Sequence, residues 1–523
     1  MYWSSLFLLF LCCTTCQAQT PAFKLFFGTS VLNETWREPL IFDNPLPKWI
    51  KGTLIRNGPG RIEVGKRSFK NLFDGFAKLH SWQFPGNGSS FFTSKFVQSE
   101  TYKESLRIND IAMYETLDAL SPPLNLSEQK VAFSRGMDNM NVNIYNYSGD
   151  CVILNDYWKL YQIDCNTLET IRSVTAKVPG EDISFPYASK LSVAHPLREY
   201  GTDHHLTVLQ SISMLPLLPH KLTFVRIKSA GIREKIAEWN VKQMPYLHSF
   251  SVTERYAVIF ACPFYVNVEN ILKGSTPIDS LIFHKDEPTI AYIVNLSTGK
   301  VTTIETETVF SMHHVNAYEA DEDTLLMDVA AYPDAAIMPF FEFKILMNKT
   351  RRDTFPYKPS LRRYKIDLKG KKITPVSVAV NPRVPQANTL DLPTINEQYR
   401  SKPYCYVYGV AFKSDFKTWG NFSFVKKDMC NSTGDLSWSL PGHYPMEGWF
   451  VPHPNGSAED DGVLMVPVFN GNNEKAYLMI LDPKTMKPVT TAYLPVSLLF
   501  HFHGRFLKTC IKNCHSRSIL WFV

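Results

Sequence analysis

Short runs of alternating or continuous apolar residues, each bounded by turn residues, recur along the whole chain. Examples are His205–Leu209, Tyr256–Phe260 and Tyr404–Tyr408. Alternation is typical of a β-strand with one buried face, and a short apolar run is typical of a strand buried on both faces. Long stretches with the period of an amphipathic helix are almost absent. The pattern therefore predicts an all-β protein built from many short strands.

Several of these strands share one hairpin pattern, in which an apolar-x-apolar run ends at a polar residue, a turn follows and a second strand begins. The polar residues are Asp164, Lys228, Asn295, Asp367 and Asp482, and the first three gaps between them are similar in length. The last gap, from Asp367 to Asp482, is long enough to hold one more hairpin. Residues 424–426 are a weaker candidate for it, and residues 82–85 could begin the series.

A repeat of this size holds four short strands, which is the content of one β-propeller blade. The series amounts to about seven hairpins, with a spacing of roughly 70 residues that fits one blade each. A blade cannot bury its faces alone, so a closed ring is the stable arrangement. The periodicity favours a propeller over a stack of β-sandwiches made from the same hairpins.

Three of the 14 histidines follow a hairpin at a similar distance. His248 comes after Lys228, His313 after Asn295 and His503 after Asp482, each by roughly 20 residues, whereas His195 follows Asp164 by a longer interval. Equivalent positions in successive blades point toward the propeller axis, so these imidazoles are candidate metal ligands. Imidazole suits iron, zinc, copper or nickel, so the spacing leaves the metal open. It also leaves open whether His313 or its neighbour His314 is the ligand.

Composition and charge exclude other classes of protein. The chain has 523 residues, 45% hydrophobic and 20% charged, with 25 Gly and 34 Pro, which excludes collagen, a coiled coil and a disordered tail. Aromatic residues make up 13% of the chain, which favours strands. The net charge of +6 is not gathered in a basic run. A nucleic-acid-binding protein would concentrate that charge on a patch or an arm.

The amino end resembles an export signal. Residues 1–20 contain no charged side chain, Ser5–Leu11 form a short apolar run, and Cys16 and Ala18 are small residues at the positions that a signal peptidase reads. We therefore expect a signal peptide over residues 1–18 and a protein that is secreted or resides in the lumen of the secretory pathway. Nine N-x-S/T triplets predict a glycoprotein, headed by Asn33, Asn87, Asn125, Asn146, Asn295, Asn348, Asn421, Asn431 and Asn455.

Seven cysteines would remain after removal of the signal, and an odd number cannot all pair. Cys510 and Cys514, with His515 beside them, are spaced like partners in a disulfide or a local zinc site. No second pair accompanies them, so a disulfide or an unpaired tail is favoured over zinc.

At the histidines the sequence resembles a known family, the carotenoid cleavage oxygenases, and most closely its animal branch of β-carotene oxygenases and the retinoid isomerase. The resemblance covers residues 47–506. The segments that carry it are Gly52–Gly60, Leu72–Gly75 with His80, Asp138–Asn143, Ala194–Pro196, Leu247–Phe250, His313–Glu319, Glu459–Gly462 and Phe502–Gly504.

The resemblance implies a seven-bladed β-propeller with an axial iron site, formed by residues 19–506 as a single domain, with residues 507–523 as a tail of unknown role. Four histidines would hold Fe²⁺: His195, His248, His313 and His503. His313 is preferred to His314 because the family's ligand stands three residues before an asparagine, here Asn316.

The family also implies three acids that accept the other ring N–H of the ligands and orient them. Glu447 matches one of them, and the other two positions are Asp156 and Asp391, where the family has Glu. Asp is one methylene shorter, so either the backbone lies closer to the imidazole or a water bridges the gap. Asn155 stands near the open iron position, where its amide could bind O2 or water. Tyr246, two residues before His248, either lines the pocket or is an ordinary core tyrosine.

The chemistry that the family implies is insertion of both atoms of O2 across one double bond of an apolar polyene. The predicted function is an Fe(II)-dependent dioxygenase that cleaves a carotenoid or apocarotenoid to aldehyde or ketone products, retinal among the candidates. Its partners would be the polyene, O2 and a membrane or lipid-particle surface. Apolar segments such as Leu215–Pro219 and Pro263–Tyr265 either enter that surface or pack inside the protein.

Three alternative functions also fit the sequence. The departures at Asp156, Asp391 and Asn155 motivate a non-catalytic carotenoid-binding protein. A retinoid isomerohydrolase is ranked below the dioxygenase because its Pro-x-Pro-Cys run is not found around Leu120–Pro123. A stilbenoid-cleaving dioxygenase would differ only in the shape of the substrate tunnel.

Overall fold

The structure is a computed structural model that describes residues 19–112, 117–135, 137–179, 187, 189–215, 217–355 and 359–508. The expected signal peptide, Cys510 and Cys514 lie outside these residues.

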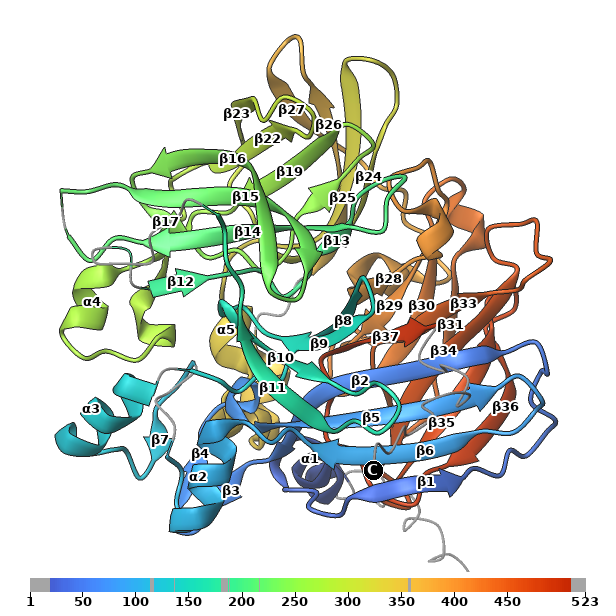
Figure 1. Cartoon of the computed structure of the whole chain (residues 1–523). Helices are drawn as coiled ribbons and strands as arrows, with labels where there is room; N and C mark the ends of the chain where they lie inside the picture. Colours follow the sequence, from blue (N-terminus) through green and yellow to red (C-terminus); the bar gives the residue numbers. More distant parts are fainter. Residues whose placement is uncertain are drawn as a thin grey trace, which may run out of the picture.

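The described chain is all-β, as the strand pattern predicts, and its strands form seven sheets of four or five strands arranged around the centre of the molecule (Figure 1). The first sheet has the order β1-β6-β5-β2-β37 (Thr35–Pro39, Phe91–Phe96, Phe76–Pro85, Lys51–Arg61, His503–Leu507). The second consists of β8 to β11 (Asn143–Tyr147, Asp150–Leu154, Lys159–Ile163, Thr170–Thr175). The third has the order β12-β14-β15-β16 with β13 beside β14 (Ser189–Leu191, His205–Ile212, His220–Ser229, Ile232–Val241, and Leu197–Arg198 for β13).

The remaining four large sheets follow in chain order. The fourth has the order β18-β19-β22-β23 (Ser251–Val252, Tyr256–Ala261, Thr289–Asn295, Val301–Thr306). The fifth runs from β24 to β27 (Phe310–Glu319, Thr324–Tyr332, Ser360–Asp367, Lys372–Val376). The sixth runs from β28 to β31 (Asp391–Thr394, Tyr406–Ala411, Ser423–Asp428, Leu436–Trp438). The seventh has the order β32-β34-β35-β36 with β33 beside β34 (His443–Pro445, Gly462–Asn470, Lys475–Asp482, Lys487–Tyr493, and Trp449–Pro452 for β33).

Smaller elements lie outside these sheets. Two three-stranded sheets are β3-β4-β7 (Glu63–Val64, Arg67–Phe69, Leu120–Ser121) and β17-β20-β21 (Met244–Pro245, Phe264–Val266, Leu281–Phe283). The helices α1 to α7 are Gln19–Gly28, Glu100–Ile108, Leu126–Arg135, Val268–Leu272, Ile337–Phe340, Phe343–Leu346 and Lys349–Thr354. The 3₁₀ turns are Leu72–Asp74, Ile278–Ser280, Pro385–Thr389, Glu397–Tyr399 and Ser432–Gly434. Within the described residues no helix combines the length and the apolar character that crossing a bilayer requires.

The seven segments of the predicted repeat lie in seven different sheets. Each belongs to, or directly follows, the third strand of its sheet: β5, β10, β15, β22, β26, β30 and β35. The period in the sequence is therefore the spacing from one sheet to the next.

The last described strand completes the first sheet. β37 pairs antiparallel with β2, with His503 opposite Asn57 and Leu507 opposite Thr53, and Figure 1 shows the red end of the chain beside the blue strands. Neighbouring sheets contact each other through the strand at one edge of each sheet, called here its first strand, which in the first sheet is β37. β8 contacts β37, β24 contacts β18 and β28, and β33 contacts β37. This arrangement brings the first strands, and the residues at their ends, together at the centre.

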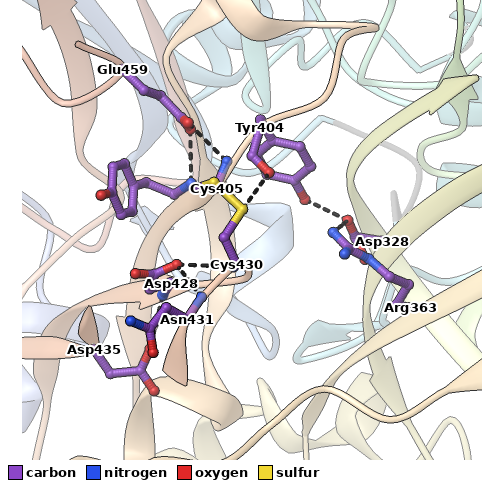
Figure 2. Close-up of a disulfide and its surroundings, with 10 residues drawn as sticks. Asp328, Arg363, Tyr404, Cys405, Asp428, Cys430, Asn431, Asp435 and Glu459 are labelled. Atoms are coloured by element: carbon purple, nitrogen blue, oxygen red, sulfur yellow. Dashed lines mark hydrogen bonds and ion pairs between the residues drawn. A yellow bond between two sulfur atoms is a disulfide. The ribbon is translucent and has the colours of Figure 1, made fainter. Parts of the chain in front are cut away.

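A disulfide joins two strands of the sixth sheet. Cys405, just before β29, is bonded to Cys430, just after β30 (Figure 2). Beside it, the Tyr404 hydroxyl donates to Asp328 at 2.7 Å, and Arg363 donates to both oxygens of that carboxylate at 2.8 Å. This buried network links the fifth and sixth sheets away from the centre.

Candidate metal centre

Four histidines lie in or next to the first strands of four different sheets. His195 lies between β12 and β13, where the first strand of the third sheet is interrupted. His248 lies between β17 and β18, His313 lies within β24, and His503 is the first residue of β37. Side chains from distant parts of the chain thus reach one point.

The four imidazoles converge. The Nε2 atom of His195 lies 3.1 Å from that of His248 and 3.2 Å from that of His503. One ring nitrogen from each of the four histidines lies within 4.8 Å of those of the other three. The Nε2 atom of His313 is buried without a hydrogen-bond partner among the described residues. A buried imidazole nitrogen without a partner, facing three others, fits a divalent transition metal, for which neutral imidazole is a preferred ligand.

Three carboxylates hold the other ring nitrogens. The Nδ1 atom of His248 lies 2.7 Å from Asp156, that of His313 lies 2.7 Å from Asp391, and that of His503 lies 2.8 Å from Glu447. A carboxylate at Nδ1 keeps the proton there, so the lone pair of Nε2 points to the centre. Both aspartates therefore reach their histidines directly, with no water between the carboxylate and the ring.

Each carboxylate has further donors. Asp156 accepts from the Ala194 backbone N–H at 2.8 Å and from the Tyr246 hydroxyl at 2.7 Å. Asp391 accepts from the Leu392 N–H at 2.7 Å and from the Tyr332 hydroxyl.

Glu447 has a charged donor instead. It accepts from the Arg56 guanidinium at 2.5 Å and from the Gly504 N–H at 3.2 Å. Arg56 stands in a segment that carries the family resemblance, but its spacing did not indicate this contact. Tyr332 had no signal in the sequence at all.

Burial and neighbouring charges set the ionisation of the site. Burial, with the neighbouring histidines, lowers the pKa of His195 well below its ordinary value, and burial lowers the pKa of His503 to about 4. Burial also lowers the pKa of His313, but the neighbouring carboxylates, with Asp391 the strongest, together outweigh burial and raise that pKa overall. Burial would raise the pKa of Glu447, but His503 and Arg56 lower it, so the carboxylate is ionised.

An apolar cavity of about 270 Å³ leads to the histidines. His248, His313 and His503 border it. Its walls are mainly apolar and include Phe73, Phe341, Phe412, Trp419, Phe500 and Phe502. Asn155 and Tyr246 also border it, so Tyr246 lines the pocket. The Asn155 amide donates to Asn139 O at 3.0 Å and accepts from Tyr157 N–H at 2.7 Å, so both its ends are bonded within the chain.

Comparison with known families identifies the family of this chain. Residues 31–508 match the family model described as retinal pigment epithelial membrane protein. The chain belongs to this family. The resemblance to the carotenoid oxygenases that the sequence motifs indicate is thereby confirmed.

Relatives in the family carry names that describe carotenoid cleavage. The chain is 28% identical to the beta,beta-carotene 15,15'-dioxygenase of Mus musculus, over 90% of this chain and 88% of the relative. It is 27% identical to the mitochondrial carotenoid-cleaving dioxygenase of Mustela putorius furo, over 88% of this chain and 92% of the relative.

Solved structures share the fold. A variant of the Synechocystis apocarotenoid oxygenase superposes with a TM-score of 0.80 at 23% identity, over 94% of this chain and 99% of that one. The cobalt-substituted Synechocystis enzyme superposes with the same TM-score at 22% identity, over the same shares of the two chains.

The comparisons correct the predicted location. Secretion, or residence in the lumen of the secretory pathway, is wrong, because relatives that match over 88% of the chain are named as mitochondrial enzymes, in Mustela putorius furo and in Macaca fascicularis. The apolar run at Ser5–Leu11 lacks the positive side chains that an export signal carries before it. N-x-S/T triplets also arise by chance in any long chain, so neither feature is specific.

Proposed function

We propose that this protein is an Fe(II)-dependent dioxygenase that cleaves a double bond of a carotenoid or apocarotenoid to carbonyl products. The observation that carries the proposal is the group of four converging histidines at an apolar cavity. Membership of a family whose relatives are named as carotene-cleaving dioxygenases supports it.

His195, His248, His313 and His503 would hold the iron, and the seven large sheets would be seven propeller blades around an axis that passes through it. When bound, the iron supplies the activation of O2. Four neutral ligands leave the charge of the cation intact, and they leave coordination positions for O2 and substrate. Asp156, Asp391 and Glu447 orient the ligands through their Nδ1 atoms.

The cavity would bind and position the substrate. Its aromatic walls bind an apolar chain by removing it from water, and they present one of its double bonds to the histidines. The same walls exclude water, which limits side reactions of an activated oxidant. Proton transfer is not needed for this cleavage, so the buried acids serve orientation only.

Product analysis with labelled oxygen tests the proposal. The full chain, loaded anaerobically with Fe²⁺, is given β-carotene or an apocarotenal under ¹⁸O2, and the products are reduced at once so that the carbonyl oxygen cannot exchange with water. We expect one ¹⁸O atom in each of the two cleavage products. Iron-loaded protein that binds these polyenes and forms no product would contradict the dioxygenase and favour a carrier.

A membrane surface beside the cavity is part of the same proposal. Ile212 and Ile271 border the cavity. Leu272, 63% exposed, directly follows Ile271, and Leu217, 96% exposed, stands a few residues after Ile212. Exposed apolar side chains next in sequence to the lining of a lipophilic pocket are suited to insertion into a phospholipid bilayer, from which the polyene would enter.

Replacing these two leucines with charged residues should reduce membrane binding. We expect the variant with Leu217→Glu and Leu272→Glu to bind phosphatidylcholine vesicles at least about tenfold more weakly, because burial of one leucine contributes about 1.5–3 kcal/mol. Flotation of the protein with vesicles measures this. Ile41→Glu is the matched control, since Ile41 is 88% exposed and does not border the cavity. Equal loss in the control, or no loss in the double variant, would place the membrane contact elsewhere.

A further inference from the structure

The three acids at the histidines are supported in two different ways. The longer acid, Glu447, is held by the Arg56 guanidinium. The two shorter acids are each held by a tyrosine hydroxyl, Asp156 by Tyr246 and Asp391 by Tyr332. Both tyrosines also border the apolar cavity. Two lines of hydrogen bonds therefore run from a tyrosine through an aspartate to a histidine and end at the proposed metal.

We propose that Tyr332 and Tyr246 are positioning residues, whose hydroxyls fix the orientation of Asp391 and Asp156 and thereby aim His313 and His248 at the metal. This inference rests on the proposed function, because it assigns the tyrosines to the same site. It adds a layer of residues beyond the ligands and their acids.

Tyr332 has the stronger effect on its acid. In Asp391 the oxygen Oδ1 accepts from His313 and from the Leu392 N–H, whereas Oδ2 accepts from the Tyr332 hydroxyl. Asp391 and Tyr332 are 8% and 4% exposed. Without the hydroxyl, Oδ2 is a buried acceptor that has lost its donor, and the carboxylate is free to turn away from the imidazole. The orientation of the His313 ring is then no longer fixed.

Tyr246 shares its acceptor. The oxygen Oδ2 of Asp156 accepts from both Tyr246 and His248, and Oδ1 accepts from the Ala194 N–H. Loss of this hydroxyl leaves both oxygens of Asp156 with a donor. Loss of the Tyr332 hydroxyl should therefore weaken metal binding more than loss of the Tyr246 hydroxyl.

The test is a titration of metal-free full-length protein with Co²⁺, which gives both an affinity and a visible spectrum that reports on ligand geometry. We expect Tyr332→Phe to bind Co²⁺ about tenfold more weakly, since residues that support metal ligands typically contribute tenfold or more to affinity, and to shift the absorption bands of the bound ion. Tyr246→Phe should shift the bands and weaken binding by less. Thermal unfolding of the metal-free variants confirms that each is folded, and Tyr246→Phe decides the question if Tyr332→Phe does not fold.

Tyr404→Phe is the matched control. Tyr404 is also a buried tyrosine whose hydroxyl donates to a buried aspartate, Asp328 (Figure 2). Among the described residues, neither of the two has a hydrogen bond to the four histidines. Its loss should leave the affinity for Co²⁺ and the spectrum unchanged.

The outcomes separate the two proposals. Wild-type protein that binds Co²⁺, with wild-type affinity and spectrum in both tyrosine variants, would overturn the positioning role and leave the proposed function standing. An equal change in Tyr404→Phe would also overturn it, because the effect would then be a general loss of stability. Wild-type protein that binds neither Co²⁺ nor Fe²⁺ would overturn the proposed function itself.

Discussion

His313→Ala is expected to reduce bound iron to below a tenth of the wild-type amount and to lower carotenoid cleavage about a thousandfold or more. The change removes the ring whose Nε2 atom is buried without a partner in the described part of the chain, and it leaves Asp391 without its imidazole. Bound metal supplies several kcal/mol of catalysis, and each increment of about 1.4 kcal/mol is a factor of ten in rate. Metal analysis after gel filtration and product formation from β-carotene measure the two effects.

The neighbouring histidine provides the control. The Nδ1 atom of His314 lies 2.7 Å from the Ser251 hydroxyl, and its ring is not part of the group of four. His314→Gln should therefore retain its iron. Iron retained in His313→Ala but lost in His314→Gln would reverse the assignment of the ligand.

Glu447→Gln should have the second largest effect, on stability as well as on metal binding. The Arg56 side chain is fully buried, and it donates to Glu447 at 2.5 Å and to Phe502 O at 3.2 Å. Removing one partner of a buried ion pair typically costs about 3–5 kcal/mol, because the other charge is left without compensation. We expect the free energy of unfolding to fall by that amount, and the iron content to fall because His503 loses its carboxylate. Urea unfolding and metal analysis measure the two.

A second buried ion pair separates the two effects of this change. Lys427 in β30 and Asp435 just before β31 form an ion pair of 2.7 Å with almost no exposure. Neither residue belongs to the group of four histidines. Asp435→Asn should lower the stability by a similar amount and leave the iron content unchanged. Adding Arg56→Met to Glu447→Gln should restore part of the stability, since the uncompensated charge is then gone. If Glu447→Gln is as stable as wild type, the Arg56 contact contributes nothing.

The repeat could be read from the sequence because most of the sheets share one local pattern. Strand alternation and turn residues are local properties, and the interval at which they recur matches the step from one sheet to the next. The histidine offsets follow from the same period, because the first strand of each sheet comes soon after the preceding hairpin. His195 departs from the common offset, and it lies where the first strand of its sheet is interrupted between β12 and β13.

The residues around the ligands could not be read in this way. Tyr332 is 59 residues from Asp391 and Arg56 is 391 residues from Glu447, and each contact depends on how neighbouring strands and sheets are placed in space. No local pattern links such positions. Whether Asp156 and Asp391 contact their histidines directly or through a water also depends on where the backbone lies, which no local pattern gives. The predicted location is wrong because a short uncharged apolar segment is weak evidence of export.

Iron bound to the wild-type protein is the most direct test of the central claim, that four histidines from four sheets form one metal site. The full chain is expressed with added Fe²⁺, purified without oxygen, and its iron and zinc are quantified per chain by mass spectrometry. We predict about one iron per chain, which is lost in His313→Ala and retained in His314→Gln. Wild-type protein that stays iron-free under these conditions, or that holds the same iron without His313, would contradict the account.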